Sequence, residues 1–154
     1  MSETTSRLLA GKDGLGEKMS IVLRYCQANK WSKVFSIVQE DPALGLMPVL
    51  MKNFINTSII HQAITSKGDT FQRARVIRQI LRQTPQAAGM TNGFGSLPLH
   101  VIAQRNTKMK AQVKEDLMYE LVKAYPDGLT LAGGKGKRTP LHVLFTGKFC
   151  PLRN

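Results

Sequence analysis

Three segments of similar sequence recur along the chain, and each carries a histidine at the same place. They are NFINTSIIHQAI at 53–64, NGFGSLPLHVIA at 92–103 and GKGKRTPLHVLF at 134–145. Their histidines are the only ones in the chain and lie 39 and 42 residues apart: His61, His100 and His142. A recurrence of this length predicts a repeat architecture, in which one small structural unit stacks on the next.

Three prolines recur with nearly the same spacing as the histidines, 43 and 41 residues apart: Pro42, Pro85 and Pro126. Each follows apolar residues spaced by one, three and four positions, such as Val34, Ile37 and Val38 before the first proline. This spacing places the apolar residues on one face of a helix, and a proline just beyond a helix ends it. Each unit is therefore predicted to contain a turn, a short helix, a connector, a longer amphipathic helix and a proline stop.

The start of the short helix has a local signal of its own in the last unit. Thr139 is a good N-cap because its hydroxyl can accept a hydrogen bond from a free amide of the first turn. Pro140 suits the first helical position, where its missing N–H is no loss. Ser58 replaces the threonine in the first unit, and Leu97 replaces it in the second, where the cap must come from elsewhere. No alternating apolar and polar segment is long enough for a substantial sheet.

The segments GSLPLHVIA and KRTPLHVLF resemble the Thr-Pro-Leu-His signature of ankyrin repeats, and the resemblance covers roughly residues 31–145. It implies that the histidine near the start of each first helix makes hydrogen bonds that tie adjacent turns together. We expect this structural role for His61, His100 and His142.

Some turn residues match the family and others depart from it. Asn92 and Gly95 match the family's turn positions, whereas Lys137 stands where the last turn would have glycine. The units recur about every 41 residues, against about 33 in the family. The additional residues are expected between the two helices of each unit.

The fold expected from these observations is all-α: an ankyrin-like helical-hairpin solenoid of about two and a half units with a helical N-terminal cap. We predict a repeat domain at 17–147, between a polar N-terminal tail at 1–16 and a C-terminal tail at 148–154. The third unit has only its first helix, which leaves open that the sequence is a fragment of a longer repeat protein.

No catalytic or metal-binding pattern accompanies the histidines. The carboxylate nearest to any of them in the sequence is Asp69, eight residues from His61. Cys26 and Cys150 are far apart and match no metal or redox spacing. We therefore expect no catalytic residue, metal, cofactor or small-molecule substrate, and an enzyme is the disfavoured alternative.

Two absences in the sequence bear on the compartment. The chain has no apolar run long enough for a transmembrane helix, and its N-terminus lacks the apolar stretch of a secretion signal. We therefore expect a cytoplasmic or nuclear protein with no membrane partner.

Positive charge is concentrated in the C-terminal half. The net charge is +12, and residues 70–154 contain 14 Lys and Arg against 4 Asp and Glu, whereas residues 1–69 contain 8 against 6. Such asymmetry favours an acidic partner or nucleic acid on the C-terminal half. A basic surface that is merely solvated is the alternative.

Two clusters are the candidate binding residues. One lies on the predicted turns and comprises Phe94, Lys135, Lys137 and Arg138. The other lies on one predicted helix face, with spacings of three and four: Arg75, Arg78 and Arg82. We predict a non-catalytic protein–protein interaction module for an acidic partner. The alternative is a ribonucleoprotein subunit that contacts RNA phosphates, although few aromatic side chains lie near the charges to stack on bases.

Overall fold

The computed structural model describes residues 14–50, 56–104, 107–134 and 136–148. These residues form an all-α fold in which strands contribute very little. Two strands of two residues each, β1 (Val49–Leu50) and β2 (Asn56–Thr57), pair antiparallel with Val49 opposite Thr57. The expectation of a helical protein without a substantial sheet is therefore confirmed for the described part of the chain.

The first helix pair is α2 (Gly14–Gln27) and α3 (Trp31–Glu40). Asn29 makes the turn between them with a φ of 58°, a left-handed conformation that asparagine tolerates better than most residues. Lys18 of α2 forms an ion pair with Asp41, just after α3. Because α2 begins at Gly14, residues 14–16 belong to a helix and not to the N-terminal tail in which they were predicted.

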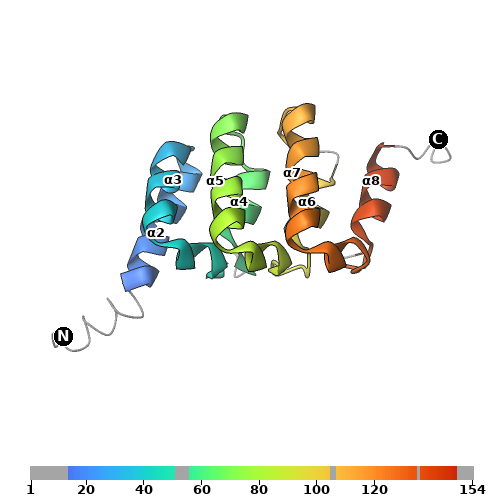
Figure 1. Cartoon of the computed structure of the whole chain (residues 1–154), viewed down its shortest axis with the longest axis horizontal. Helices are drawn as coiled ribbons and strands as arrows, with labels where there is room; N and C mark the ends of the chain where they lie inside the picture. The colour runs from blue at the N-terminus through green and yellow to red at the C-terminus, as the bar shows by residue number, and fades with distance from the viewer. Residues whose placement is uncertain (1–13, 51–55, 105–106, 135, 149–154) are drawn as a thin grey trace.

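The remaining helices follow the predicted order of a short helix and then a longer one. They are α4 (Ile59–Thr65) and α5 (Thr70–Gln83), α6 (Pro98–Ile102) and α7 (Ala111–Ala124), and finally α8 (Pro140–Lys148). Figure 1 shows α3, α5 and α7 side by side in one row. The helices α2, α4, α6 and α8 pack successively against one another in a second row.

Each recurring proline ends a helix as predicted and then begins a short 3₁₀ helix. The long helices end two residues before the proline, and the 3₁₀ segments are η2 (Pro42–Leu46), η3 (Pro85–Gly89) and η4 (Pro126–Leu129). The residue before each proline adopts nearly the same conformation, with ψ of 81° at Asp41, 75° at Thr84 and 79° at Tyr125. Proline disfavours helical ψ in the preceding residue, so these three stops have one local cause.

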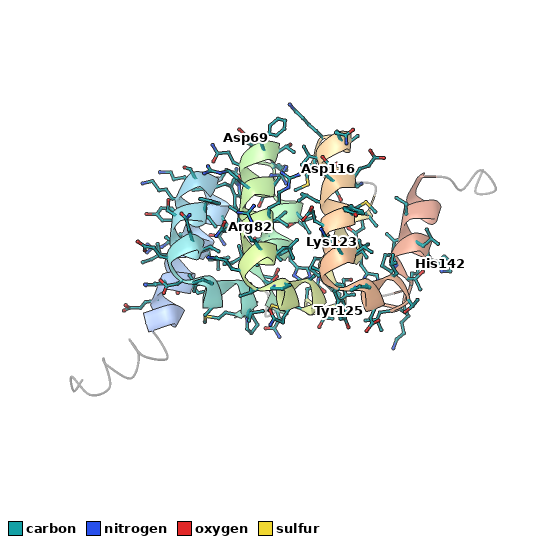
Figure 2. All side chains as sticks on the ribbon, viewed as in Figure 1. Asp69, Arg82, Asp116, Lys123, Tyr125 and His142 are labelled. Carbon is teal, nitrogen blue, oxygen red and sulfur yellow. The ribbon has the colours of Figure 1, made fainter. Side chains whose placement is uncertain are left out.

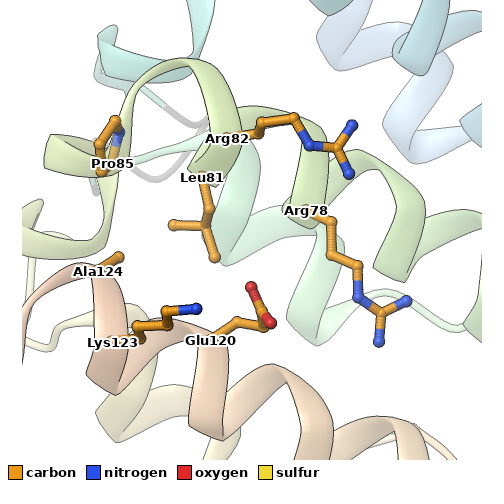
Figure 3. A pocket seen from close by; sticks show the side chains of 7 residues that line it. All are labelled: Arg78, Leu81, Arg82, Pro85, Glu120, Lys123 and Ala124. Atoms are coloured by element: carbon orange, nitrogen blue, oxygen red, sulfur yellow. The ribbon is translucent and has the colours of Figure 1, made fainter.

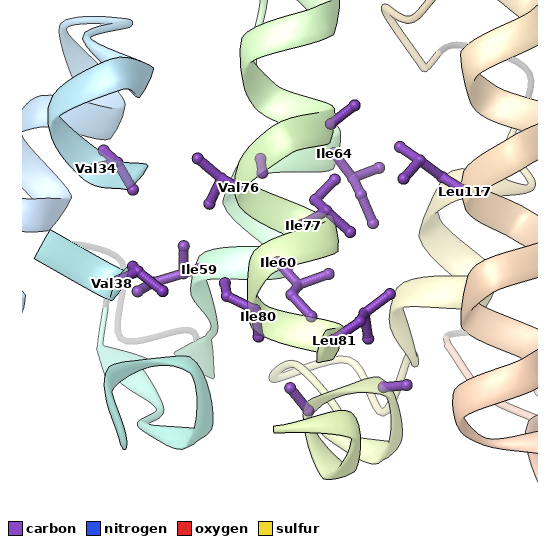
Figure 4. Close-up of a cluster of buried hydrophobic side chains, with 14 of the residues drawn as sticks. Val34, Val38, Ile59, Ile60, Ile64, Val76, Ile77, Ile80, Leu81 and Leu117 are labelled. Atoms are coloured by element: carbon purple, nitrogen blue, oxygen red, sulfur yellow. The ribbon is translucent and has the colours of Figure 1, made fainter. Parts of the chain in front are cut away.

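The core lies between the two rows of helices and continues from one pair to the next. The short helix α4 is buried along nearly its whole length, whereas α3, α5 and α7 bury one face. Figure 4 shows the buried side chains that meet at the centre, among them Val34, Val38, Ile60, Ile64, Ile77, Ile80 and Leu117. No single helix pair could enclose this cluster alone, which is why the pairs must stack.

Candidate interaction surfaces and histidine tethers

His61 connects the start of α4 to the turn of the next unit. Its ring is buried, with Nε2 2.9 Å from the carbonyl oxygen of Ser96 and Nδ1 2.7 Å from the hydroxyl of Ser58. A carbonyl can only accept, so Nε2 carries the hydrogen and Ser58 donates to Nδ1. Ser58 also accepts from the backbone N–H of His61, at 3.4 Å, and so caps α4.

His100 makes the corresponding connection one unit later. Its Nε2 donates to the carbonyl of Leu131 at 2.8 Å, and its Nδ1 accepts from the backbone N–H of Leu97 at 3.0 Å. Leu97 has no polar side chain to cap α6, and the ring takes up its amide instead. His142 occupies the same place in the last unit and is exposed. Its backbone N–H donates to Thr139 Oγ1 at 3.2 Å, the cap predicted for this helix.

The environment of His61 keeps its imidazole neutral. Burial lowers the pKa of His61 to about 4, and the hydrogen bond to the Ser96 carbonyl opposes this only in part. A ring with both nitrogens engaged in the fold has no nitrogen left to bind a metal or take a proton from a substrate. The arrangement therefore serves to hold adjacent units together.

Arg73, which was not among the predicted sites, is a second buried connection. It lies on α5 with no exposed surface, and its guanidinium donates to four backbone carbonyls. Nε donates to Gly68 at 2.9 Å, Nη1 to Ala63 and Ile64 at 2.9 and 3.2 Å, and Nη2 to Lys108. These bonds tie the end of α4 to the connector of the next unit. Burial lowers the pKa of Arg73, and Asp69 opposes that effect.

The predicted turn cluster lies on two adjacent turns. Phe94 is 44 % exposed, on a turn in which the Asn92 side chain accepts from the backbone N–H groups of Phe94 and Ser96, each at 3.0 Å. Lys137 and Arg138 are exposed on the following turn. Lys135 falls outside the described residues.

Two further backbone features shape these turns. Gly95 has a φ of 78°, and Lys137 has a φ of 47° at the position where glycine was expected. A Cβ atom on Gly133 would lie 2.5 Å from the Gly95 carbonyl oxygen, so the two turns are in backbone contact. The fold therefore brings Phe94 and the basic turn onto one edge of the molecule.

The predicted helix cluster is divided by the structure. The guanidinium of Arg75 lies 4.1 Å from the ring centroid of Phe35, on the neighbouring helix α3. Arg78 and Arg82 instead line a groove between α5 and α7. The Arg75 side chain therefore extends towards α3, whereas Arg78 and Arg82 line the groove, and a binding patch shared by all three stays a prediction.

The groove has a volume of about 330 Å³ and is shown in Figure 3. Its lining comes from both helices and the residue that begins η3: Arg78, Leu81, Arg82, Pro85, Glu120, Lys123 and Ala124. Figure 2 shows Arg82 and Lys123 on the two facing helices of the long-helix row. Lys123 was not among the predicted binding residues, because only the packing of α7 against α5 places it beside the arginines.

Other chemistry is sparse in the described part of the chain. Burial raises the pKa of the Cys26 thiol to about 12, so that it stays protonated and unreactive. Within the described residues, no cluster of three or more His, Cys, Asp or Glu side chains is suited to hold a metal ion. None of the described helices combines the length and apolar composition needed to cross a bilayer.

Comparison of the chain with protein-family models, with curated proteins and with solved structures finds no match. The ankyrin resemblance therefore stays a prediction.

Proposed function

We propose that this protein is an ankyrin-type solenoid that binds an acidic protein partner and has no catalytic role. The succession of turn, short helix and long helix supports the solenoid. So do the two buried histidines, whose Nε2 atoms donate to the turn of the following unit. Rigid, tethered units present their surface side chains in fixed positions, which lowers the entropy lost on binding.

One observation carries the proposed partner chemistry. Cationic side chains are present on two surfaces, the turn cluster and the groove between α5 and α7. In the groove, the described residues provide no ion pair for Arg78, Arg82 or Lys123. Such a surface attracts an acidic partner and guides its approach, because complementary charge raises the association rate. The same charge would also attract RNA phosphates, so a test must separate the two.

Fluorescence anisotropy with a labelled glutamate homopeptide and a labelled oligo(U) strand makes this separation. We expect the acidic peptide to bind more tightly than RNA. Both affinities are measured between about 50 and about 200 mM NaCl. If oligo(U) binds more tightly than the peptide and its affinity falls more steeply with salt, the RNA alternative is favoured.

A charge-matched pair of variants tests whether the two surfaces are responsible. The first variant reverses four cations of these surfaces to Glu: Arg78, Arg82, Lys137 and Arg138. The control reverses four cations of the N-terminal part: Arg24, Lys30, Lys33 and Lys67. The first should lose most of the affinity and the control should keep it. Equal losses would show that net charge alone attracts the peptide and would reject the proposal.

A further inference from the structure

The groove between α5 and α7 has both charged and apolar lining residues. Three cations and one carboxylate line it, which leaves a formal excess of two positive charges: Arg78, Arg82, Lys123 and Glu120. Leu81 is buried and forms an apolar floor together with Ala124 and Pro85. Such a groove offers both charge and apolar contact to a ligand.

The cations of the groove are only weakly engaged within the protein. Arg82 donates to Gln79 Oε1 at 3.4 Å, a long hydrogen bond, and the described residues provide no hydrogen bond or ion pair for Arg78 or Lys123. The guanidinium groups therefore keep the paired donors with which arginine binds carboxylates.

Glu120 determines where an acidic ligand can lie. Figure 3 shows its carboxylate between the side chains of Arg78 and Lys123. A ligand carboxylate is repelled at this central position and attracted on either side of it. The position beside Glu120 favours an N–H donor, and Leu81 of the same lining offers an apolar contact to an aliphatic side chain.

We propose that this groove binds a short peptide segment of the partner in which acidic residues flank an aliphatic one. The inference rests on the proposed function and assigns the acidic segment to this surface. The RNA backbone offers the apolar floor only its hydroxylated ribose and no alkyl side chain, and no aromatic residue lines the groove to stack on a base. The lining therefore favours a peptide over RNA.

Three fluorescein-labelled peptides test the ligand chemistry by anisotropy. They are EDLEDLED, the serine analogue EDSEDSED and the neutral analogue QNLQNLQN. The first should bind at least about fivefold more tightly than the second, because the leucine contacts contribute about 1 kcal/mol. It should bind at least about tenfold more tightly than the third. Equal affinities for the first two would overturn the assignment of the apolar floor.

Variants then locate the site. The groove variant, Arg82→Glu with Lys123→Glu, should weaken EDLEDLED binding at least about tenfold. The matched control, Arg24→Glu with Lys67→Glu, should change it less than about twofold. Glu120→Gln removes the internal carboxylate and should strengthen binding by about threefold, a gain that an unfolded variant could not produce.

One outcome separates this inference from the proposed function, and a second rejects both. If Lys137→Glu with Arg138→Glu abolishes binding and the groove variant does not, the acidic partner stands and the groove is rejected. If neither acidic peptide binds and oligo(U) does, both proposals fall.

Discussion

The buried imidazole of His61 predicts that the stability of this protein falls in mild acid. The residue is 2 % exposed, and the pKa of its imidazole is lowered from 6.5 to about 4 in the folded state. The unfolded chain therefore takes up a proton in a pH range where the folded chain does not. By linkage, the stability that this ring contributes is complete above about pH 6.5 and is lost progressively as the pH falls towards 4.

The magnitude follows from the same two pKa values. At about 1.4 kcal/mol per pH unit, the difference between 6.5 and about 4 amounts to about 3 kcal/mol. A domain of this size has a total stability of about 5–15 kcal/mol, so the loss is a large fraction of the whole. We expect a clear decline in the free energy of unfolding across this range.

Urea denaturation followed by circular dichroism, at intervals from pH 7.5 to 4, measures this decline. Carboxylates also titrate in the lower part of the range, so the comparison is with His61→Gln, which cannot take up the proton. The difference between the two proteins should shrink as the pH falls, and it should persist in high salt because the ring is buried. Parallel stability profiles for the two proteins would refute this reasoning.

Three further substitutions test other buried or strained positions. Arg73→Met leaves the carbonyls that the guanidinium binds without a donor and should lower the free energy of unfolding by about 3 kcal/mol in urea titration. A loss below about 1 kcal/mol would show that water molecules replace the guanidinium as donors. Gly133→Ala places a Cβ 2.5 Å from the Gly95 carbonyl oxygen and 2.9 Å from the His100 ring, so the Tm should fall by several degrees, and an unchanged Tm would contradict the backbone contact. Lys137→Gly removes the backbone strain of a non-glycine residue in the left-handed conformation, at φ 47°, and should raise the free energy of unfolding by about 0.5–1 kcal/mol in the same urea assay. A lower free energy of unfolding would count against this turn geometry.

The sequence alone determined the recurrence of the segments, the order of the short and long helices, where the long helices end and where α8 begins. Thr139 caps α8, and each recurring proline ends a long helix at the same distance. These features arise between residues a few positions apart, so they can be read from the chain without knowing its path. The ankyrin resemblance likewise led us to expect the histidines to connect turns.

Only the tertiary structure decided which side chains meet across units. The acceptors of His61 and His100 lie 35 and 31 residues further along the chain. Arg73 precedes Ile77 by four residues, which places it on the apolar face of α5, but only the packed units supply its carbonyl partners. The packing of neighbouring helices also places the Arg75 guanidinium over Phe35 of α3 and places Lys123 beside the arginines of the groove. Local sequence specifies how each helix is built, whereas the neighbours of its surface depend on how the apolar faces of successive pairs pack.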